Sequence, residues 1–223
     1  MADILIGIPS IRKDERFLKS FHVFFHSMPD KHKISVVWQK DKKLADAQNS
    51  IIDNYFEEGF DYVLFLDDDH WGHTYEMLEC LINADTYMAT IKSYSRHYPY
   101  SCSLMKKTGN SYAGIENGHG YQECDLSGFP MTLLRKDLFK KLERPYFRDN
   151  YSGSVRGWAT DEEFCVRLNS VGIKPIGCFQ HCLSHGDITE ENVLLKREKE
   201  RVEKNNEALH YLFNKRKKIM QGV

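Results

Sequence analysis

The feature that most constrains this 223-residue chain is an apolar run that ends in three consecutive aspartates. Residues 62–66 read Tyr-Val-Leu-Phe-Leu, and Asp67-Asp68-Asp69-His70 follows directly. A short, continuously apolar segment of this kind predicts a strand buried on both faces of a parallel sheet. Three carboxylates cannot enter a core unpaired, because burying an isolated charge is costly. The end of this strand must therefore face solvent, a metal or a ligand.

The rest of the first half alternates strand-like and helix-like segments. Apolar runs predict strands at 4–8, 34–38 and 87–91, and apolar residues at helical spacing predict helices at 17–28, 46–58 and 75–82. Strands that alternate with helices indicate right-handed βαβ units, whose ligand crevice lies beyond the carboxyl ends of the strands. The acidic cluster is expected at that edge.

The second half has a mixed α+β pattern. A hairpin is expected over 101–115, around a Lys-Thr-Gly-Asn turn. Thr160 and Glu163 form a potential capping box for a helix that ends at Gly172, and a strand-like run follows at 176–183.

Charge and composition exclude several classes of protein. The 31 Lys and Arg residues nearly balance the 32 Asp and Glu residues, so no overall positive field favours nucleic acid. No stretch approaches about 18 apolar residues and no signal peptide is recognisable, so neither a transmembrane segment nor export is expected. The six scattered cysteines favour reduced thiols and a cytoplasmic location.

The Asp67-x-Asp69 pair points to a metal. Carboxylates at a strand end can hold a hard divalent cation and leave coordination positions for phosphate oxygens. The alternative is that these aspartates only form a turn or aid solubility, as surface strand ends often do. The five apolar residues before them favour the metal.

Three segments resemble the GT-A glycosyltransferases, in particular the family 2-like members. Residues 60–69 are similar to the family's strand and metal-binding motif, and the preceding helix carries Gln48-Asn49 where many relatives have Arg-Asn. Residues 125–135 resemble the strand and small-residue turn beside the donor sugar. Residues 160–167 resemble the segment with the catalytic acidic residue.

The resemblance implies a fold and a reaction. The fold would be a GT-A three-layer α/β/α sandwich with a mixed, mainly parallel central sheet over residues 1–186, followed by a charged helical tail over 187–223. The reaction would be metal-dependent transfer of a sugar from a nucleoside-diphosphate sugar, UDP- or GDP-linked, to an acceptor hydroxyl. The acceptor could be a glycan, a protein, a lipid or a modified base.

The resemblance also implies roles for particular residues. Asp161 would be the base that takes the acceptor proton, with Glu162 beside it. Asp67, Asp69 and His185 would hold Mn²⁺ or Mg²⁺, and Asp67 would contact the metal through water or bind the ribose. The expected donor contacts are Pro9, Ser10, Asp46, Asn49, Asp67, Asp68, Ser127, Gly128, Arg156 and Trp158.

Alternatives remain open for the chemistry of these residues. In a retaining enzyme Asp161 would position or stabilise charge, and both Asp161 and Glu162 are also favourable simply as acidic residues at a helix N-terminus. Structural zinc is a rival for the run from Cys178 to His185, which also contains His181 and Cys182. Alternation along a strand would send these four side chains to opposite faces, which weakens that rival.

Alternatives also remain for the function and for the tail. A nucleotidyltransferase is a rival, although no glycine-rich phosphate loop follows Ile8. A non-catalytic nucleotide-sugar-binding or assembly protein is another. The tail could form a homodimer, but Glu198 and Asn205 interrupt its apolar stripe and favour a solvated helix.

Overall fold

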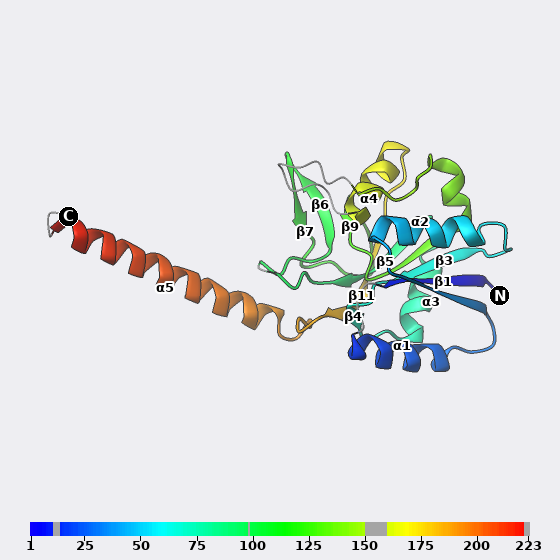
Figure 1. The fold of residues 1–223 in the computed structure, drawn as a ribbon, viewed down its shortest axis with the longest axis horizontal. Helices are drawn as coiled ribbons and strands as arrows, with labels where there is room; N and C mark the ends of the chain where they lie inside the picture. Colours follow the sequence, from blue (N-terminus) through cyan, green and yellow to red (C-terminus); the bar gives the residue numbers. More distant parts are fainter. Residues whose placement is uncertain (11–13, 98, 150–159, 221–223) are drawn as a thin grey trace.

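The computed structural model describes residues 1–10, 14–97, 99–149 and 160–220, and a mixed sheet lies at its centre (Figure 1). The strands of this sheet are β1 (Asp3–Ser10), β2 (Lys33–Lys40), β3 (Tyr62–Leu66), β4 (His70–Trp71), β5 (Met88–Ser93), β8 (Tyr121–Glu123), β10 (Met131–Arg135) and β11 (Ile176–His185). Their order is β2-β1-β3-β10-β5-β11-β4, and β8 pairs with β11. Strands β1, β2, β3, β5 and β11 run parallel, whereas β10 is antiparallel between β3 and β5. The predicted mixed, mainly parallel sheet is confirmed.

Helices cover both faces of this sheet. One face carries α1 (Glu15–Ser27) and α3 (Tyr75–Asn83), and the other carries α2 (Leu44–Tyr55), α4 (Thr160–Ser170) and the 3-10 helix η1 (Lys136–Lys141) (Figure 1). Each helix turns an apolar stripe towards the strands. The result is a three-layer α/β/α sandwich with one apolar cluster on each side of the sheet.

Helix α1 shows how local sequence produces this packing. The Asp14 side chain accepts a hydrogen bond from the Arg16 backbone N–H and so caps the helix. Phe17 and Phe24 lie two turns apart on one face and are at most 1% exposed. The helix ends before Met28 and Pro29. Burial of each of these rings stabilises the fold by about 1.5–3 kcal/mol.

A second, three-stranded sheet and a long helix complete the chain. The sheet contains β6 (Leu104–Thr108), β7 (Ser111–Gly114) and β9 (Leu126–Ser127) in the order β7-β6-β9. Gly109 adopts a positive φ of 61° in the β6–β7 turn, which glycine tolerates. Helix α5 (Val193–Met220) projects away from the body of the molecule (Figure 1). No described helix has the length and apolar character needed to cross a membrane.

Two local expectations differ from the structure. Thr160 lies inside α4 rather than before it, and its hydroxyl donates a hydrogen bond to Asp149, so the capping box with Glu163 was wrong. The hairpin begins at residue 104 rather than 101, because residues 94 and 102 instead form a bridge at the base of a separate loop. That loop belongs to the candidate site.

Candidate metal and donor site

A cavity of about 400 Å³ lies where β3, β5 and β11 reach their carboxyl ends. Parallel strands bring these ends to one edge of the sheet, as the alternating sequence pattern predicted. Its lining residues are Asp67, Asp69, His70, Ser93, Ser95, Arg96, His97, Ser101, Ser103, Met105, Gly128, Phe129, Asp161, Glu162 and His185.

Asp69 is the centre of the charged groups in this cavity. Its Oδ2 atom lies 3.2 Å from His185 Nε2 and 3.3 Å from Arg96 Nη1. Its Oδ1 atom lies 3.1 Å from His70 Nδ1, although that ring nitrogen is not aligned for a hydrogen bond. His70 and His185 are cross-strand partners of β4 and β11, and their rings stack with centroids 4.2 Å apart. Three potential ligands therefore converge on one point.

The tautomer of His185 bears on what this point can bind. Its Nδ1 atom lies 3.1 Å from the Tyr94 carbonyl oxygen, and a carbonyl can only accept, so Nδ1 carries the hydrogen. A neutral His185 then turns the Nε2 lone pair towards the Asp69 carboxylate. A proton or a cation must lie between two such acceptors. A backbone carbonyl that fixes the ring through its second nitrogen is typical of histidines that bind metals.

The ligand atoms of Asp69, His70 and His185 all lie within 4.8 Å of one another. Carboxylate and imidazole ligands suit Mn²⁺ and, with phosphate oxygens added, Mg²⁺. The donor set therefore fits a divalent cation. His70 was not among the predicted ligands, and Asp67 lines the cavity without belonging to this converging group.

Burial and the neighbouring charges affect the pKa values of Asp69 and His70. Burial alone would raise the pKa of Asp69, but the neighbouring His185 and His70 outweigh it and hold that pKa far below its usual range. Burial lowers the pKa of His70, and the charge of His185 adds to this effect, although Asp69 opposes it. Asp69 is thus ionised, and His70 favours the neutral form that can bind a metal.

The first turn of α4 brings Asp161 to the same cavity. A Cβ atom on Gly128 would lie 3.3 Å from Asp161 Oδ2, so the carboxylate approaches the backbone of this glycine closely. Burial, with the charge of Glu162, raises the pKa of Asp161 to about 6. A carboxylate with such a pKa can accept a proton near neutral pH.

The predicted donor residues fall into different places. Pro9 and Ser10 are buried at the end of β1, and Ser10 Oγ donates to Asp68 Oδ2 at 2.9 Å. Asp46 is exposed in the first turn of α2. Asn49 holds the Phe147 backbone with both halves of its amide, at 2.8 and 3.0 Å.

Ser127 and Gly128 differ in their access to the cavity. Ser127 is fully buried and donates to the Gly128 carbonyl at 3.0 Å, and only Gly128 of this pair lines the cavity. Arg156 and Trp158 lie outside the described residues. Among the described residues, the rival set of Cys178, His181, Cys182 and His185 does not converge as a group of potential metal ligands.

The loop after β5 supplies lining residues that sequence analysis missed. Ser95, Arg96 and His97 follow β5, and Ser101 and Ser103 return along the other arm of the loop. The Ser93-Tyr94-Ser95-Arg96-His97 run begins two residues after the end of the predicted strand at 87–91. Polar residues that follow a buried parallel strand are expected at the ligand edge of the sheet, and this rule pointed to Asp67 and Asp69. The same rule could have found the 93–97 run.

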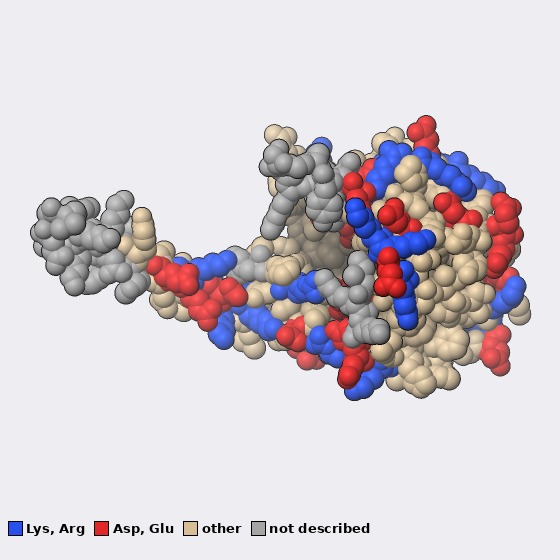
Figure 2. All heavy atoms as spheres, viewed as in Figure 1, with Lys and Arg blue, Asp and Glu red and all other residues tan. Residues whose placement is uncertain are grey.

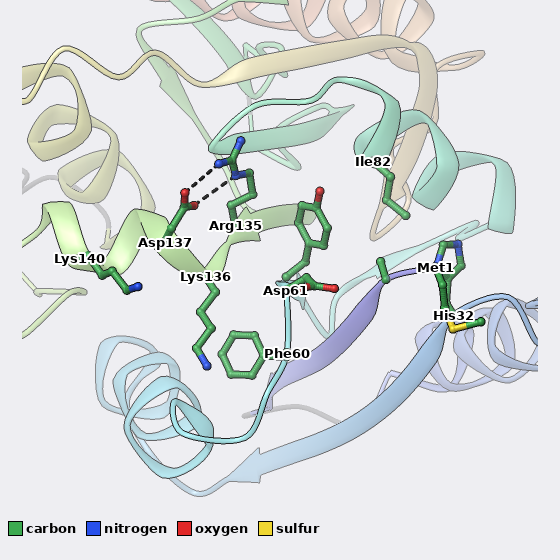
Figure 3. A pocket seen from close by; sticks show the side chains of 11 residues that line it. Met1, His32, Phe60, Asp61, Ile82, Arg135, Lys136, Asp137 and Lys140 are labelled. Atoms are coloured by element: carbon green, nitrogen blue, oxygen red, sulfur yellow. Dashed lines mark hydrogen bonds and ion pairs between the residues drawn. The ribbon is translucent and has the colours of Figure 1, made fainter.

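A second cavity, of about 520 Å³, lies at the opposite end of the sheet (Figure 3). Arg135 and Asp137 pair with each other there, because Arg135 Nη2 lies 2.7 Å from Asp137 Oδ2 and the two side chains form a second hydrogen bond. Lys136 stacks over the Phe60 ring at 4.7 Å. This cavity is larger, but the converging carboxylate and imidazole groups line the smaller one, which is therefore the candidate site.

Comparisons with known proteins bear on the fold. No family model and no curated protein matches the chain. Among solved structures, A197 from STIV is 16% identical, with a TM-score of 0.53 over 82% of this chain and 83% of that one. GalNAc-T7 with UDP, GalNAc and Mn²⁺ is 8% identical, with a TM-score of 0.56 over 82% of this chain. The chain spans 44% of the length of that structure.

The chain has a GT-A fold. A nucleotide-diphospho-sugar transferase described as putative, from Desulfovibrio desulfuricans G20, is also similar, at 12% identity, with a TM-score of 0.48 over 87% of each chain. The likeness to the GalNAc-T7 structure, at a TM-score of 0.56, confirms the predicted fold by structure rather than by sequence. In the GT-A sandwich of this chain, Asp69, His185 and Asp161 occupy the carboxyl edge of the sheet.

Proposed function

We propose that this protein is a metal-dependent glycosyltransferase, which moves a sugar from a nucleoside-diphosphate sugar to an acceptor hydroxyl. One observation carries the proposal: Asp69, His70, His185 and Asp161 face a single cavity of about 400 Å³ in a GT-A fold. A donor of this class needs a cation for its diphosphate and a carboxylate for the incoming hydroxyl.

In the proposed reaction Asp161 is the base. Its carboxylate takes the proton of the acceptor hydroxyl while the acceptor oxygen bonds to the anomeric carbon. The bond between that carbon and the diphosphate oxygen breaks, and the nucleoside diphosphate leaves with the electron pair. The raised pKa of Asp161, about 6, supports this role because it leaves the group ionised yet basic at neutral pH. Glu162 lies beside it in the same cavity.

Asp69 and His185, with His70, would hold the cation. When bound, a divalent cation neutralises charge on the leaving diphosphate. Asp67 would contact the ribose or the metal through water, and Asp68 would act with Ser10, its hydrogen-bond partner, at the nucleotide side. We propose Mn²⁺ or Mg²⁺, because both accept carboxylate, imidazole and phosphate ligands together. The GalNAc-T7 structure contains UDP and Mn²⁺, which supports a UDP-linked donor and manganese as the first pair to test.

Further donor contacts remain proposals. They are Pro9, Asp46, Asn49, Ser127, Gly128, Arg156 and Trp158. Residues 1–186 would form the transferase domain and residues 187–223 an appended tail, in a cytoplasmic protein. The acceptor could be a glycan, a protein, a lipid or a modified base.

A screen of nucleotide-sugars with and without Mn²⁺ tests the proposal. A ligand that binds the folded state raises the melting temperature, and we expect a shift for one donor only when Mn²⁺ is present. Incubation with that donor should then release a nucleoside diphosphate. Release of pyrophosphate would instead support a nucleotidyltransferase, and binding without any release would support a binding protein.

A paired substitution assigns the two halves of the site. Asp161→Asn should abolish transfer and retain the donor-dependent melting shift, whereas Asp69→Asn should lose the shift as well. Full transfer activity in Asp161→Asn would contradict the role of Asp161 as the base.

A further inference from the structure

We propose that Arg96 is an exchangeable counter-cation. It neutralises Asp69 when no metal is bound, and it turns to the donor diphosphate when the metal enters. The inference rests on the proposed function and adds a residue to it. No predicted site residue has this role, and it follows from the atoms that surround one carboxylate oxygen.

Arg96 and His185 contact the same oxygen atom of Asp69. The distances to Oδ2 are 3.3 Å from Arg96 Nη1 and 3.2 Å from His185 Nε2. A divalent cation that uses His185 and Asp69 as ligands would occupy the space in front of this oxygen, beside a guanidinium that cannot lose its charge. A metal cation and a guanidinium beside the same carboxylate oxygen repel each other. The metal and Arg96 therefore compete for Asp69.

The side chain of Arg96 can move while its backbone stays in place. The loop is closed at its base by the bridge between Tyr94 and Cys102 and by the hydrogen bond from Ser95 N to Ser101 O, at 2.9 Å. Helix α5 adds a brace, because Arg197 donates to the carbonyl of Tyr100. The Arg96 side chain itself is 35% exposed and lines the cavity, so it can leave Asp69 without entering the core.

The charge of the cavity gives Arg96 a second partner. Within the described lining, Arg96 is the single Lys or Arg side chain, and it stands among Asp67, Asp69, Asp161 and Glu162. A nucleoside diphosphate adds further negative charge. A guanidinium released from Asp69 can bind two phosphate oxygens through its planar fork, which a lysine cannot reproduce. The metal and the diphosphate then reinforce each other's binding through one side chain.

Binding of Mn²⁺ alone tests this exchange without turnover. It is measured by titration calorimetry and by electron paramagnetic resonance of the free ion. Arg96→Met removes the competitor, so Mn²⁺ alone should bind about tenfold more tightly than to the unaltered protein. UDP should then improve Mn²⁺ binding less than it does in the unaltered protein. Arg96→Lys should keep Mn²⁺ binding near the original level and still weaken UDP binding.

Arg135→Met is the matched control. Arg135 also pairs with an aspartate, Asp137 at 2.7 Å, and its side chain is 33% exposed, but it lines the cavity at the other end of the sheet (Figure 3). Neither Mn²⁺ nor UDP affinity should change in this variant. Melting temperatures of all variants check that they fold.

The possible results separate the two proposals. If the unaltered protein binds Mn²⁺ and UDP, and folded Arg96→Met binds both with the same affinities, the exchange is refuted and the proposed function stands. Weaker rather than tighter binding of Mn²⁺ alone in Arg96→Met also refutes it. If the unaltered protein binds no Mn²⁺ with or without any nucleotide, both proposals fail together.

Discussion

At the scale of single residues, the pKa of Asp161 gives the proposed reaction a pH dependence. The base must be ionised, and its pKa is raised to about 6 by burial and by the charge of Glu162. Transfer should therefore rise with pH through about 6 and level off above 7, with roughly a tenth of the plateau rate at pH 5. Initial rates from pH 5 to 8 at saturating donor check this. A profile that is flat over this range would contradict the assignment of Asp161.

The close approach of Gly128 to Asp161 leads to a second prediction. In Gly128→Ala the new Cβ atom would meet Asp161 Oδ2 at 3.3 Å and would displace the carboxylate by a few tenths of an ångström. We expect kcat to fall at least about tenfold, because small misplacements of a catalytic group are costly. The melting temperature should change little. Gly59→Ala is the control, since a Cβ atom there meets nothing within 4 Å, and equal rates in both variants would show that the close approach has no catalytic role.

Residues of the site differ in how far the sequence could reveal them. Asp67 and Asp69 follow a five-residue apolar strand, so local pattern alone indicates that they lie at a sheet edge. The contact between Asp69 and His185 spans 116 residues and depends on the parallel course of β3 and β11. The resemblance to a known family, rather than the spacing, suggested it. His70 was not predicted as a potential ligand, because its position depends on the pairing of the short strand β4 with β11.

At the scale of elements, periodicity predicted the core well and the loops poorly. Strand β3 was predicted with its observed ends, and helices α1, α2 and α3 within a few residues, because each buries an apolar stripe that the sequence displays. The loop after β5 carries no such stripe. The shape of this loop depends on the bridge at its base and on contacts with α5. The shape, unlike the presence of polar residues after the strand, could therefore not be inferred from local pattern.

The contact between α1 and the loop after β4 predicts a pH effect on stability. His73 is 3% exposed, its Nδ1 atom lies 2.9 Å from Ser20 Oγ, and burial lowers its pKa to about 3. Above about pH 6.5 this histidine is neutral in both the folded and the unfolded chain. Below it, the unfolded chain binds a proton that the folded chain excludes. The free energy of unfolding should therefore fall as the pH is lowered below about 6.5, by at most about 1.4 kcal/mol per pH unit from this group.

Urea unfolding at pH 7 and pH 5 measures this effect. His73→Gln should be less stable than the unaltered protein at pH 7 but should lose less stability on acidification. His22→Gln, at an exposed position of α1, is the matched control, because it replaces a histidine and leaves the contact between His73 and Ser20 in place. The same loss on acidification in His73→Gln as in the unaltered protein would show that another group is responsible.

At the scale of the whole molecule, charge and shape divide the chain into a body and a projection. Lys, Arg, Asp and Glu side chains interleave over the visible face and along α5, without a large patch of one sign (Figure 2). This agrees with the formal net charge of −1 and gives no electrostatic footprint for nucleic acid on that face. The charge of that face therefore gives no support to a nucleic-acid acceptor.

Helix α5 is attached to the body only near its start, among the described side chains. Val193 is 2% exposed, Arg197 lies 3.0 Å from Glu116, and the Tyr100 hydroxyl donates to Glu200 at 3.1 Å. The described side chains at 201–208 are all exposed. Pairs such as Lys199 with Glu203 add only a few tenths of a kcal/mol each, so most of the helix contributes little to the stability of the body.

Two truncations follow from this attachment. A chain that ends at residue 204 keeps every contact with the body named above, so its melting temperature should match that of the full chain within about 2 °C. A chain that ends at residue 191 loses Val193 and Arg197, which brace the loop that carries Arg96. A loss of about 2–3 kcal/mol there should lower the melting temperature by roughly 5–10 °C. Equal melting temperatures for both truncations would contradict this division.

The full chain and a truncated chain also test whether α5 forms a homodimer. A dimer through α5 would need a continuous apolar stripe, but Glu198 and Asn205 interrupt the series that contains Leu195 and Val202. We therefore expect the full chain to sediment as a monomer at micromolar concentration, and the chain that ends at residue 191, which lacks Leu195 and Val202, to do the same. If the full chain sediments at twice its mass and the truncated chain does not, α5 forms the dimer. The solvated helix would then be the wrong interpretation, and the exposed Val202 would be the first position to substitute in the interface.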